Sequence, residues 1–129
     1  MFNISISHGV KPKNASYSYT VLMNKSLDEV KEYANEPAFE VLENSKKVQA
    51  VHNKKNGTVM AIFHKAGSLN LGNKKLTASK GCALILEKEN SKDIIYIASH
   101  DYKSRKIKIS VSDKETNISI NKRPQKIVL

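Results

Sequence analysis

The sequence has few or none of the features from which disulfides, membrane-spanning helices and signal peptides are built. One cysteine among 129 residues excludes an internal disulfide. Cys82 stands in the apolar run 82–86, which indicates a buried, unreactive thiol. No apolar run approaches the roughly 20 residues that a membrane-spanning helix needs. The first residues lack the basic start and long apolar core of a signal peptide, and a strand is expected to begin at once, which suggests a fragment or a truncated gene.

Arginine and acidic residues are scarce beside lysine. The chain has 20 lysines and two arginines against 12 acidic residues, so its net charge is +10. Residues 1–43 hold four lysines and six acidic residues, a net −2, whereas residues 44–129 hold 18 cations and six acidic residues, a net +12. This excess predicts polyanions as partners, such as acidic polysaccharide. Because bidentate recognition of bases and phosphates favours arginine, we expect no nucleic-acid partner.

Histidine, cysteine and acidic residues do not stand at the spacing of a metal site. His52, His64 and His100 match no ligand motif. His52 and His64 could face each other across the turn 53–57, but such a cross-strand polar pair is ordinary. No acid–base pair, and no nucleophile with an orienting base, can be picked out. The sequence therefore predicts no metal, no cofactor and no catalytic residue.

The N-terminal third predicts two strands and one helix. Apolar and polar residues alternate over 2–6 and over 17–22, as in a half-buried β-hairpin. Ser26 and Glu29 have the spacing of a capping box, in which each side chain bonds the backbone N–H of the other residue. The helix that follows is short because Pro37 ends it.

From residue 39 onward the sequence predicts only strands and loops. The clearest alternation is 106–112, with Ile107 and Ile109 inward. The turn 53–57 contains Asn-Gly and predicts a hairpin over 47–64, while the glycines near 66–68 and 71–73 predict loops. Strands at a spacing of about 8–12 residues predict an all-β fold: a small antiparallel β-sandwich preceded by a β-hairpin and one short helix. The strands expected in this part are 39–43, 47–52, 58–64, 76–78, 82–89, 94–100, 106–112 and 117–121.

Several segments, taken in chain order, resemble one enzyme family. They are His8-Gly9-x-x-Pro12, Tyr17 with Tyr19, the segments 41–45 and 48–52, and Ala61-x-Phe63-x-Lys65-Ala66-Gly67. This series resembles the C-terminal β-sandwich region of the family 8 polysaccharide lyases, which include hyaluronate, chondroitin AC and xanthan lyases. Met23 departs from the family, which has a proline there, and His64 stands where an aromatic residue is usual.

The resemblance implies a division of the chain and a role. Residues 1–43 would be the end of a central β-sandwich, made of a hairpin and a linker helix, and residues 44–129 a C-terminal β-sandwich domain. In the family, Asn, His, Tyr and Arg on an upstream helical domain cleave the polysaccharide by β-elimination. None of those motif positions exists in this sequence. His8 would then have a structural role in a turn. The resemblance thus implies a non-catalytic accessory domain of an extracellular lyase, whose partners are the upstream domains and acidic polysaccharide.

A glycan contact is predicted where basic residues gather around one aromatic side chain. The residues are Tyr102, Lys103, Arg105, Lys106 and Lys108. The alternative interpretation is a solvated hairpin turn, since charged residues often serve only solubility. Further basic sets lie at 46–47, 54–55, 74–80 and 122–126. The functional alternatives are a stand-alone polyanion-binding β module and, less favoured, a nucleic-acid-binding domain or an independent enzyme.

Overall fold

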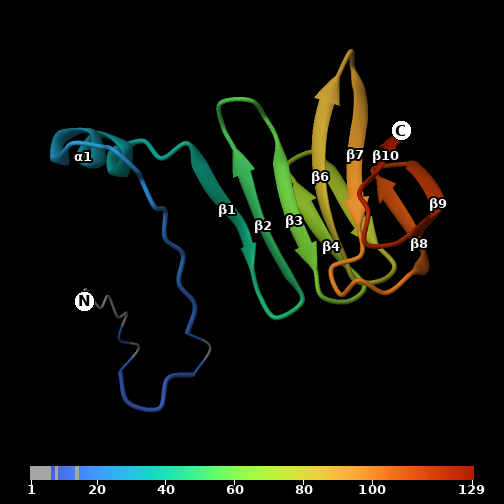
Figure 1. Ribbon diagram of the computed structural model, residues 1–129, viewed down its shortest axis with the longest axis horizontal. Coiled ribbons are helices and arrows are strands. Elements are labelled where there is room, and N and C mark those ends of the chain that lie inside the picture. Colours follow the sequence, from blue (N-terminus) through green and yellow to red (C-terminus); the bar gives the residue numbers. More distant parts are fainter. Residues whose placement is uncertain (1–6, 8, 14) are drawn as a thin grey trace.

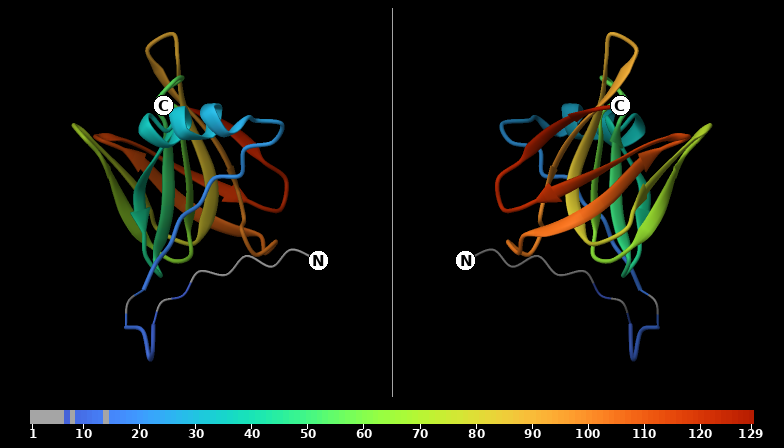
Figure 2. Two further views of the ribbon diagram at one scale, coloured as in Figure 1. Left: turned by 90° about the vertical axis from the view of Figure 1, so that its left-hand side faces the viewer. Right: turned by 90° about the vertical axis from the view of Figure 1, so that its right-hand side faces the viewer.

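Two antiparallel sheets packed face to face form the fold in a computed structural model that describes residues 7, 9–13 and 15–129 (Figures 1 and 2). The predicted all-β sandwich is confirmed. Helix α1 is Leu27–Asn35. The six-stranded sheet has, in order, β1 (Phe39–Asn44), β2 (Val48–Asn53), β3 (Val59–Phe63), β6 (Cys82–Glu89), β7 (Lys92–Ala98) and β10 (Gln125–Val128). The four-stranded sheet has β4 (Gly67–Leu71), β5 (Lys74–Ala78), β8 (Arg105–Val111) and β9 (Lys114–Ile120).

The core lies between the two sheets. Along β8, Ile107, Ile109 and Val111 are buried while Lys106 and Lys108 are exposed, as the alternation predicts. The hairpin predicted over 47–64 is confirmed by the register of β2 and β3. The largest fully buried side chains are Phe63, Leu76, Ile95, Ile97, Ile107, Ile109 and Ile120.

Helix α1 begins with the predicted capping box. The Glu29 backbone N–H donates to Ser26 Oγ (3.3 Å), and the Ser26 N–H donates to Glu29 Oε2 (2.8 Å). A hydrogen bond from Lys25 Nζ, followed by those from Ser26, lowers the pKa of Glu29 to about 2. The helix buries none of its residues, so local bonds rather than the core stabilise it.

The segment before α1 is extended but belongs to neither sheet. Tyr17, Tyr19 and Val21 are exposed at every second position, and the two tyrosine rings stack with their centroids 6.2 Å apart. The structure thus differs from the strand predicted over 17–22, because an alternating segment becomes a strand only beside another strand. The strand predicted over 2–6 and the structural role predicted for His8 lie outside the described residues.

Two strands were not predicted from the sequence. Residues 66–68 and 71–73 were expected to be loops, yet 67–71 form β4, in which Leu69 is buried and pairs with Leu76. Strand β10 pairs with β7 at the edge of the six-stranded sheet. The predicted domain boundary between residues 43 and 44 falls inside β1, so the division of the chain there stays a prediction.

Amide exchange should separate the extended segment from the sandwich. We expect residues 15–22 to exchange much faster than 47–64 and 82–111, because the latter amides lie largely in antiparallel ladders. Hydrogen exchange with mass spectrometry checks this. Equal protection throughout would mean that residues 15–22 had found a strand partner in solution.

Candidate functional site

The five predicted contact residues lie in the loop between β7 and β8 and on β8 itself. Tyr102 is 77% exposed and has a φ of 61°, which projects it from the tight loop. Lys106 and Lys108 point outward from the four-stranded sheet, because they alternate with buried isoleucines. The five residues thus share one loop and the strand that follows it, but the structure gives them different electrostatic surroundings.

Arg105 is engaged inside the protein. Its guanidinium forms an ion pair with the Asp101 carboxylate, and its Nη1 donates to the Gly81 carbonyl (3.4 Å). Asp101 Oδ1 also accepts from Ser99 Oγ (2.7 Å) and from the Lys103 backbone N–H (3.3 Å). The hydrogen bonds from Arg105, then from Ser99, hold the pKa of Asp101 well below its usual range. Arg105 therefore shapes the loop, and much of its charge is already balanced.

The three lysines also differ in whether an acidic side chain offsets their charge. Lys108 Nζ lies 2.8 Å from Glu115 Oε2, so a neighbouring strand offsets its charge. Lys103 and Lys106 are exposed, and neither forms an ion pair with any residue in the described part of the chain. Free cations of this kind attract polyanions over about 8–10 Å before salt screens them.

Tyr102 meets a basic pair that the sequence places 20 residues away. A shallow depression of about 430 Å³ is lined by Tyr102, Ser104, Asn121, Lys122 and Arg123. It forms because β7 pairs with β10 and β8 pairs with β9, which brings the two connecting loops together. The Arg123 N–H donates to Asn121 Oδ1 (2.7 Å) and the Ser99 N–H to the Asn121 carbonyl (2.7 Å), so both loops are fixed. We call Tyr102, Lys103, Lys106, Lys122 and Arg123 the basic cluster.

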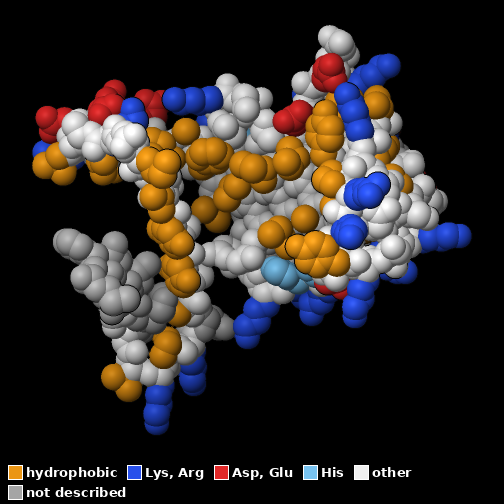
Figure 3. Space-filling model, in the orientation of Figure 1, with side chains coloured by type: hydrophobic (Ala, Val, Ile, Leu, Met, Phe, Trp, Pro, Cys, Tyr) orange, Lys and Arg blue, Asp and Glu red, His pale blue; other side chains and the backbone are white. Residues whose placement is uncertain are grey.

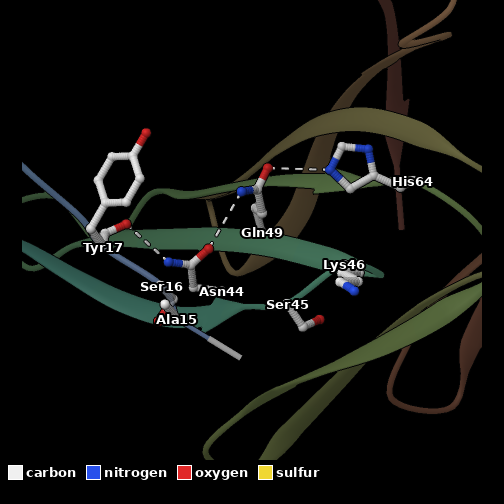
Figure 4. Close-up of a pocket in the computed structure, with 8 residues that line it drawn as sticks. All are labelled: Ala15, Ser16, Tyr17, Asn44, Ser45, Lys46, Gln49 and His64. Carbon is white, nitrogen blue, oxygen red and sulfur yellow. Dashed lines mark hydrogen bonds between the residues drawn. The ribbon is translucent and has the colours of Figure 1, made fainter. Parts of the chain in front are cut away.

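A second depression, more polar, lies beside the start of β2 (Figure 4). It has a volume of about 890 Å³. A chain of hydrogen bonds runs along it: His64 Nε2 to Gln49 Oε1 (3.2 Å), Gln49 Nε2 to Asn44 Oδ1 (3.4 Å), and Asn44 Nδ2 to the Tyr17 carbonyl (3.1 Å). Lys46 supplies the one cation among its lining residues. Amides and an imidazole can bond sugar hydroxyls, but here they bond to one another and to the Tyr17 carbonyl.

His52 and His64 do not face each other across the turn 53–57, the arrangement that the sequence allowed. His52 is paired in register with Val59, and its Nδ1 lies 3.8 Å from Glu40 Oε2. His64 stands at the other end of the hairpin and meets His100 edge-to-face, with ring centroids 5.9 Å apart. No group of three His, Cys, Asp or Glu residues that could hold a metal occurs in the described ranges. Cys82 is fully buried, and burial raises the pKa of its thiol to about 12.

Gly81 stands behind this histidine pair where there is no room for a side chain. A Cβ there would lie 2.5 Å from His100 Cε1, 2.9 Å from the His64 carbonyl and 3.1 Å from the Phe63 carbonyl. Gly81→Ala should therefore lower the free energy of unfolding by about 1–3 kcal/mol in a denaturant titration. Lys80→Ala, at an exposed neighbour, is the control. Adding His100→Ala should restore only part of the loss, because two carbonyls still clash; full recovery would contradict this account.

No helix in the described part of the chain is long and apolar enough to cross a membrane.

Two antiparallel sheets packed face to face define the class of this protein as a β-sandwich domain. Residues 40–119 match the family described as polysaccharide lyase family 8, C-terminal beta-sandwich domain, and the chain belongs to that family. The resemblance predicted from the sequence is thus confirmed.

Relatives of this chain are much longer proteins. Chondroitinase-AC from Pedobacter heparinus is 36% identical over 118 residues, which is 90% of this chain and 17% of that protein. Xanthan lyase from Bacillus sp. is 45% identical over 58 residues, which is 45% of this chain and 6% of that protein. A solved chondroitinase AC lyase, studied in oligosaccharide complexes, superimposes with a TM-score of 0.65 at 28% identity, over 81% of this chain and 17% of its own. The chain therefore spans about one sixth of the chondroitinases it matches.

Proposed function

We propose that this chain is a non-catalytic C-terminal accessory domain of a secreted bacterial lyase that cleaves acidic polysaccharide by β-elimination. The observation that carries the proposal is the family match over 40–119 together with the 17% share of the longer chondroitinase. In this proposal, residues 1–43 lead from the preceding β domain and residues 44–129 form the accessory domain. Its main work is to support the preceding domains.

A second, weaker part of the proposal is that the domain attracts acidic glycan through the basic cluster. Lys103 and Lys106 are unpaired cations within the described residues, and Tyr102 offers an exposed ring on which a sugar can stack. Lys122 and Arg123 add charge beside that ring. Of the residues predicted from the sequence, Arg105 and Lys108 contribute least, because Asp101 and Glu115 already offset their charges.

The purified chain alone should show no eliminase activity on hyaluronan, chondroitin or xanthan. β-Elimination needs a base, a group that neutralises the carboxylate and an acid near one sugar ring. The hydrogen bond from Lys25 is the main reason that the pKa of Glu29 is lowered, and the hydrogen bond from Arg105 is the main reason that the pKa of Asp101 is lowered, so both shifts have a structural cause. The measurement is ultraviolet absorbance of unsaturated product, with chondroitinase-AC as the positive control. Product above the buffer background would refute the non-catalytic assignment.

The alternative function is a stand-alone polyanion-binding module. The net +12 of residues 44–129 favours it. The two proposals differ in the strength of binding expected at physiological salt. An accessory domain needs only weak attraction, whereas tight glycan binding by the isolated chain at 0.15 M salt would favour the module.

A further inference from the structure

Tyr102 has a backbone conformation that tyrosine rarely adopts. Its φ of 61° lies in the left-handed region, where the Cβ of any residue other than glycine crowds the backbone. The side chain is nevertheless 77% exposed, so it contributes little to the core. Glycine would be less strained at this position and would cost the fold no buried surface. Strain that is kept for an exposed aromatic ring is typical of a side chain with a function of its own.

The loop holds the backbone of Tyr102 in this conformation by bonds on both sides of it. Asp101 Oδ1 accepts from Ser99 Oγ (2.7 Å) and from the Lys103 N–H (3.3 Å), and the same carboxylate forms the ion pair with Arg105. The bond between Asp101 and Lys103 closes a small turn with Tyr102 at its tip. The loop is therefore ordered before a ligand arrives, which lowers the entropy cost of binding.

The register of β8 and β9 places a second loop beside the first. Their ladder ends with the pair Arg105 and Ile120, so residues 102–104 and 121–123 leave the same end of the hairpin. The depression of about 430 Å³ lies between these two segments. Its volume falls in the range of about 300–1,000 Å³ that is typical of sites for small ligands.

The lining of this depression combines groups that suit different parts of an acidic sugar. The Tyr102 ring offers an apolar plane, and the Ser104 hydroxyl and the Asn121 amide can bond sugar hydroxyls. Lys122 and Arg123 form no ion pair with any described residue and can bind an anionic group. A neutral sugar would leave both cations without a partner, and a small inorganic anion would leave the ring unused. The lining therefore fits a ligand that has both a sugar ring and acidic groups.

The cations of the basic cluster extend beyond the depression. Lys106 pairs in register with Ser119, and Lys122 follows shortly after, so the Cα atoms of the two lysines lie within about 15 Å of each other. Figure 3 shows Lys and Arg side chains along the right-hand part and the lower edge of the sandwich, and Asp and Glu side chains mainly at α1 and at the top. Unpaired charges spread over such a span suit several acidic groups in a row. Because the depression is shallow, a chain can continue past it on both sides.

We propose that the basic cluster binds an interior stretch of an acidic polysaccharide, with one sugar ring stacked on Tyr102 and acidic groups of the same stretch on the cations. This inference rests on the second part of the proposed function and specifies its ligand: several consecutive sugars, not a chain end. The site lies at the β7–β10 edge of the six-stranded sheet, whereas α1 and the extended segment adjoin β1 at the other edge (Figure 1). The two edges are roughly 25 Å apart across the sheet, so these N-terminal elements leave the site open.

The test titrates the purified, ¹⁵N-labelled 129-residue chain with saturated hyaluronan oligosaccharides from di- to decasaccharide at low salt, followed by nuclear magnetic resonance. Affinity should rise at least about tenfold from disaccharide to hexasaccharide, and less than about threefold from hexasaccharide to decasaccharide, because the cluster is then filled. The largest shifts should fall on the amides of 99–106 and 119–125. Cellohexaose, which has no charge, is the control and should bind at least about tenfold more weakly than the hyaluronan hexasaccharide.

Tyr102→Gly distinguishes a ring that binds sugar from one that merely occupies the loop. It removes the backbone strain, so the melting temperature should rise by about 2–5 °C. It also removes the ring, so binding of the hexasaccharide should weaken about fivefold. Ser112→Gly is the matched control, because Ser112 is exposed in the β8–β9 turn with a φ of 56°. It should raise the melting temperature in the same way and leave binding unchanged, while Tyr102→Phe should bind as tightly as the wild-type chain.

Three results would overturn this inference and leave the accessory role standing. Equal affinity for disaccharide and hexasaccharide would mean that a chain end or a single acidic group is bound. Affinity that keeps rising with length and is the same in Tyr102→Gly would mean that binding follows net charge. The third result is no binding at any length. The same samples test the proposed function independently, because unsaturated product absorbing in the ultraviolet would overturn the non-catalytic assignment whatever the binding curves show.

Discussion

Phe63→Ala should lower the free energy of unfolding by about 3–5 kcal/mol, the range for removal of a fully buried phenylalanine. Phe63 is fully buried at the end of β3, between its partners Val48 and Cys82 in the neighbouring strands. Its ring also lies against Gly67, where even a Cβ would come within 3.6 Å of Cδ1. Because the ring is fully buried, its replacement by alanine leaves a cavity in the core. Urea titration followed by circular dichroism measures the loss.

Ile62→Ala is the matched control, one residue away on the same strand. Its side chain points away from the core on the six-stranded sheet and is 39% exposed, so its removal from the isolated chain should cost well under half as much as Phe63→Ala. Since total stabilities are about 5–15 kcal/mol, Phe63→Ala brings the chain close to unfolding at room temperature. Equal losses at the two positions would mean that the six-stranded sheet is covered on both faces in solution.

The sequence predicts those strands best whose hydrophobic pattern agrees with their local surroundings. The alternation of β8 and the Asn-Gly turn between β2 and β3 gave correct elements, since period-two patterning and turn chemistry are local signals. Strand β4 was not predicted because it begins at Gly67 and is followed by the turn glycine Gly72, at a φ of 67°. Two glycines so close together are more typical of a loop. The segment 17–22 has the alternating pattern of a strand but belongs to neither sheet. Its pattern could not predict this, because alternation does not specify a partner strand.

The candidate site, like the strands, was predicted only where its signals are local in the sequence. The gathering of cations around Tyr102 is visible in the sequence, and the outward direction of Lys106 and Lys108 follows from alternation. The engagement of Arg105 by Asp101 has a weak signal in their spacing of four residues, but the loop that allows it is irregular. The contribution of Lys122 and Arg123 depends on β10 pairing with β7, and the four residues of β10 are too few to predict that strand.

Replacing the four cations of the basic cluster by serine should weaken binding to heparin or hyaluronan by roughly 10- to 100-fold at low salt. Exposed charge pairs are worth about 0.2–1 kcal/mol each, so four of them sum to about 0.8–4 kcal/mol, and the middle of that range corresponds to one to two powers of ten in affinity. The variant is Lys103→Ser/Lys106→Ser/Lys122→Ser/Arg123→Ser. Its melting temperature should hardly change, because all four side chains are exposed and none is paired with an acidic side chain within the described residues. Arg105 stays intact, so the loop keeps its ion pair with Asp101.

The control removes the same charge elsewhere. Lys54→Ser/Lys55→Ser/Lys88→Ser/Lys92→Ser also loses four exposed cations, but from the β2–β3 turn and the β6–β7 hairpin end. If the basic cluster is a contact, elution salt on a heparin column should fall much further for the first variant than for the second. If both fall equally, binding follows net charge alone. Tyr102→Ala separates stacking from charge: it should weaken binding to oligosaccharide with little effect on salt dependence, because an uncharged ring releases no counterions.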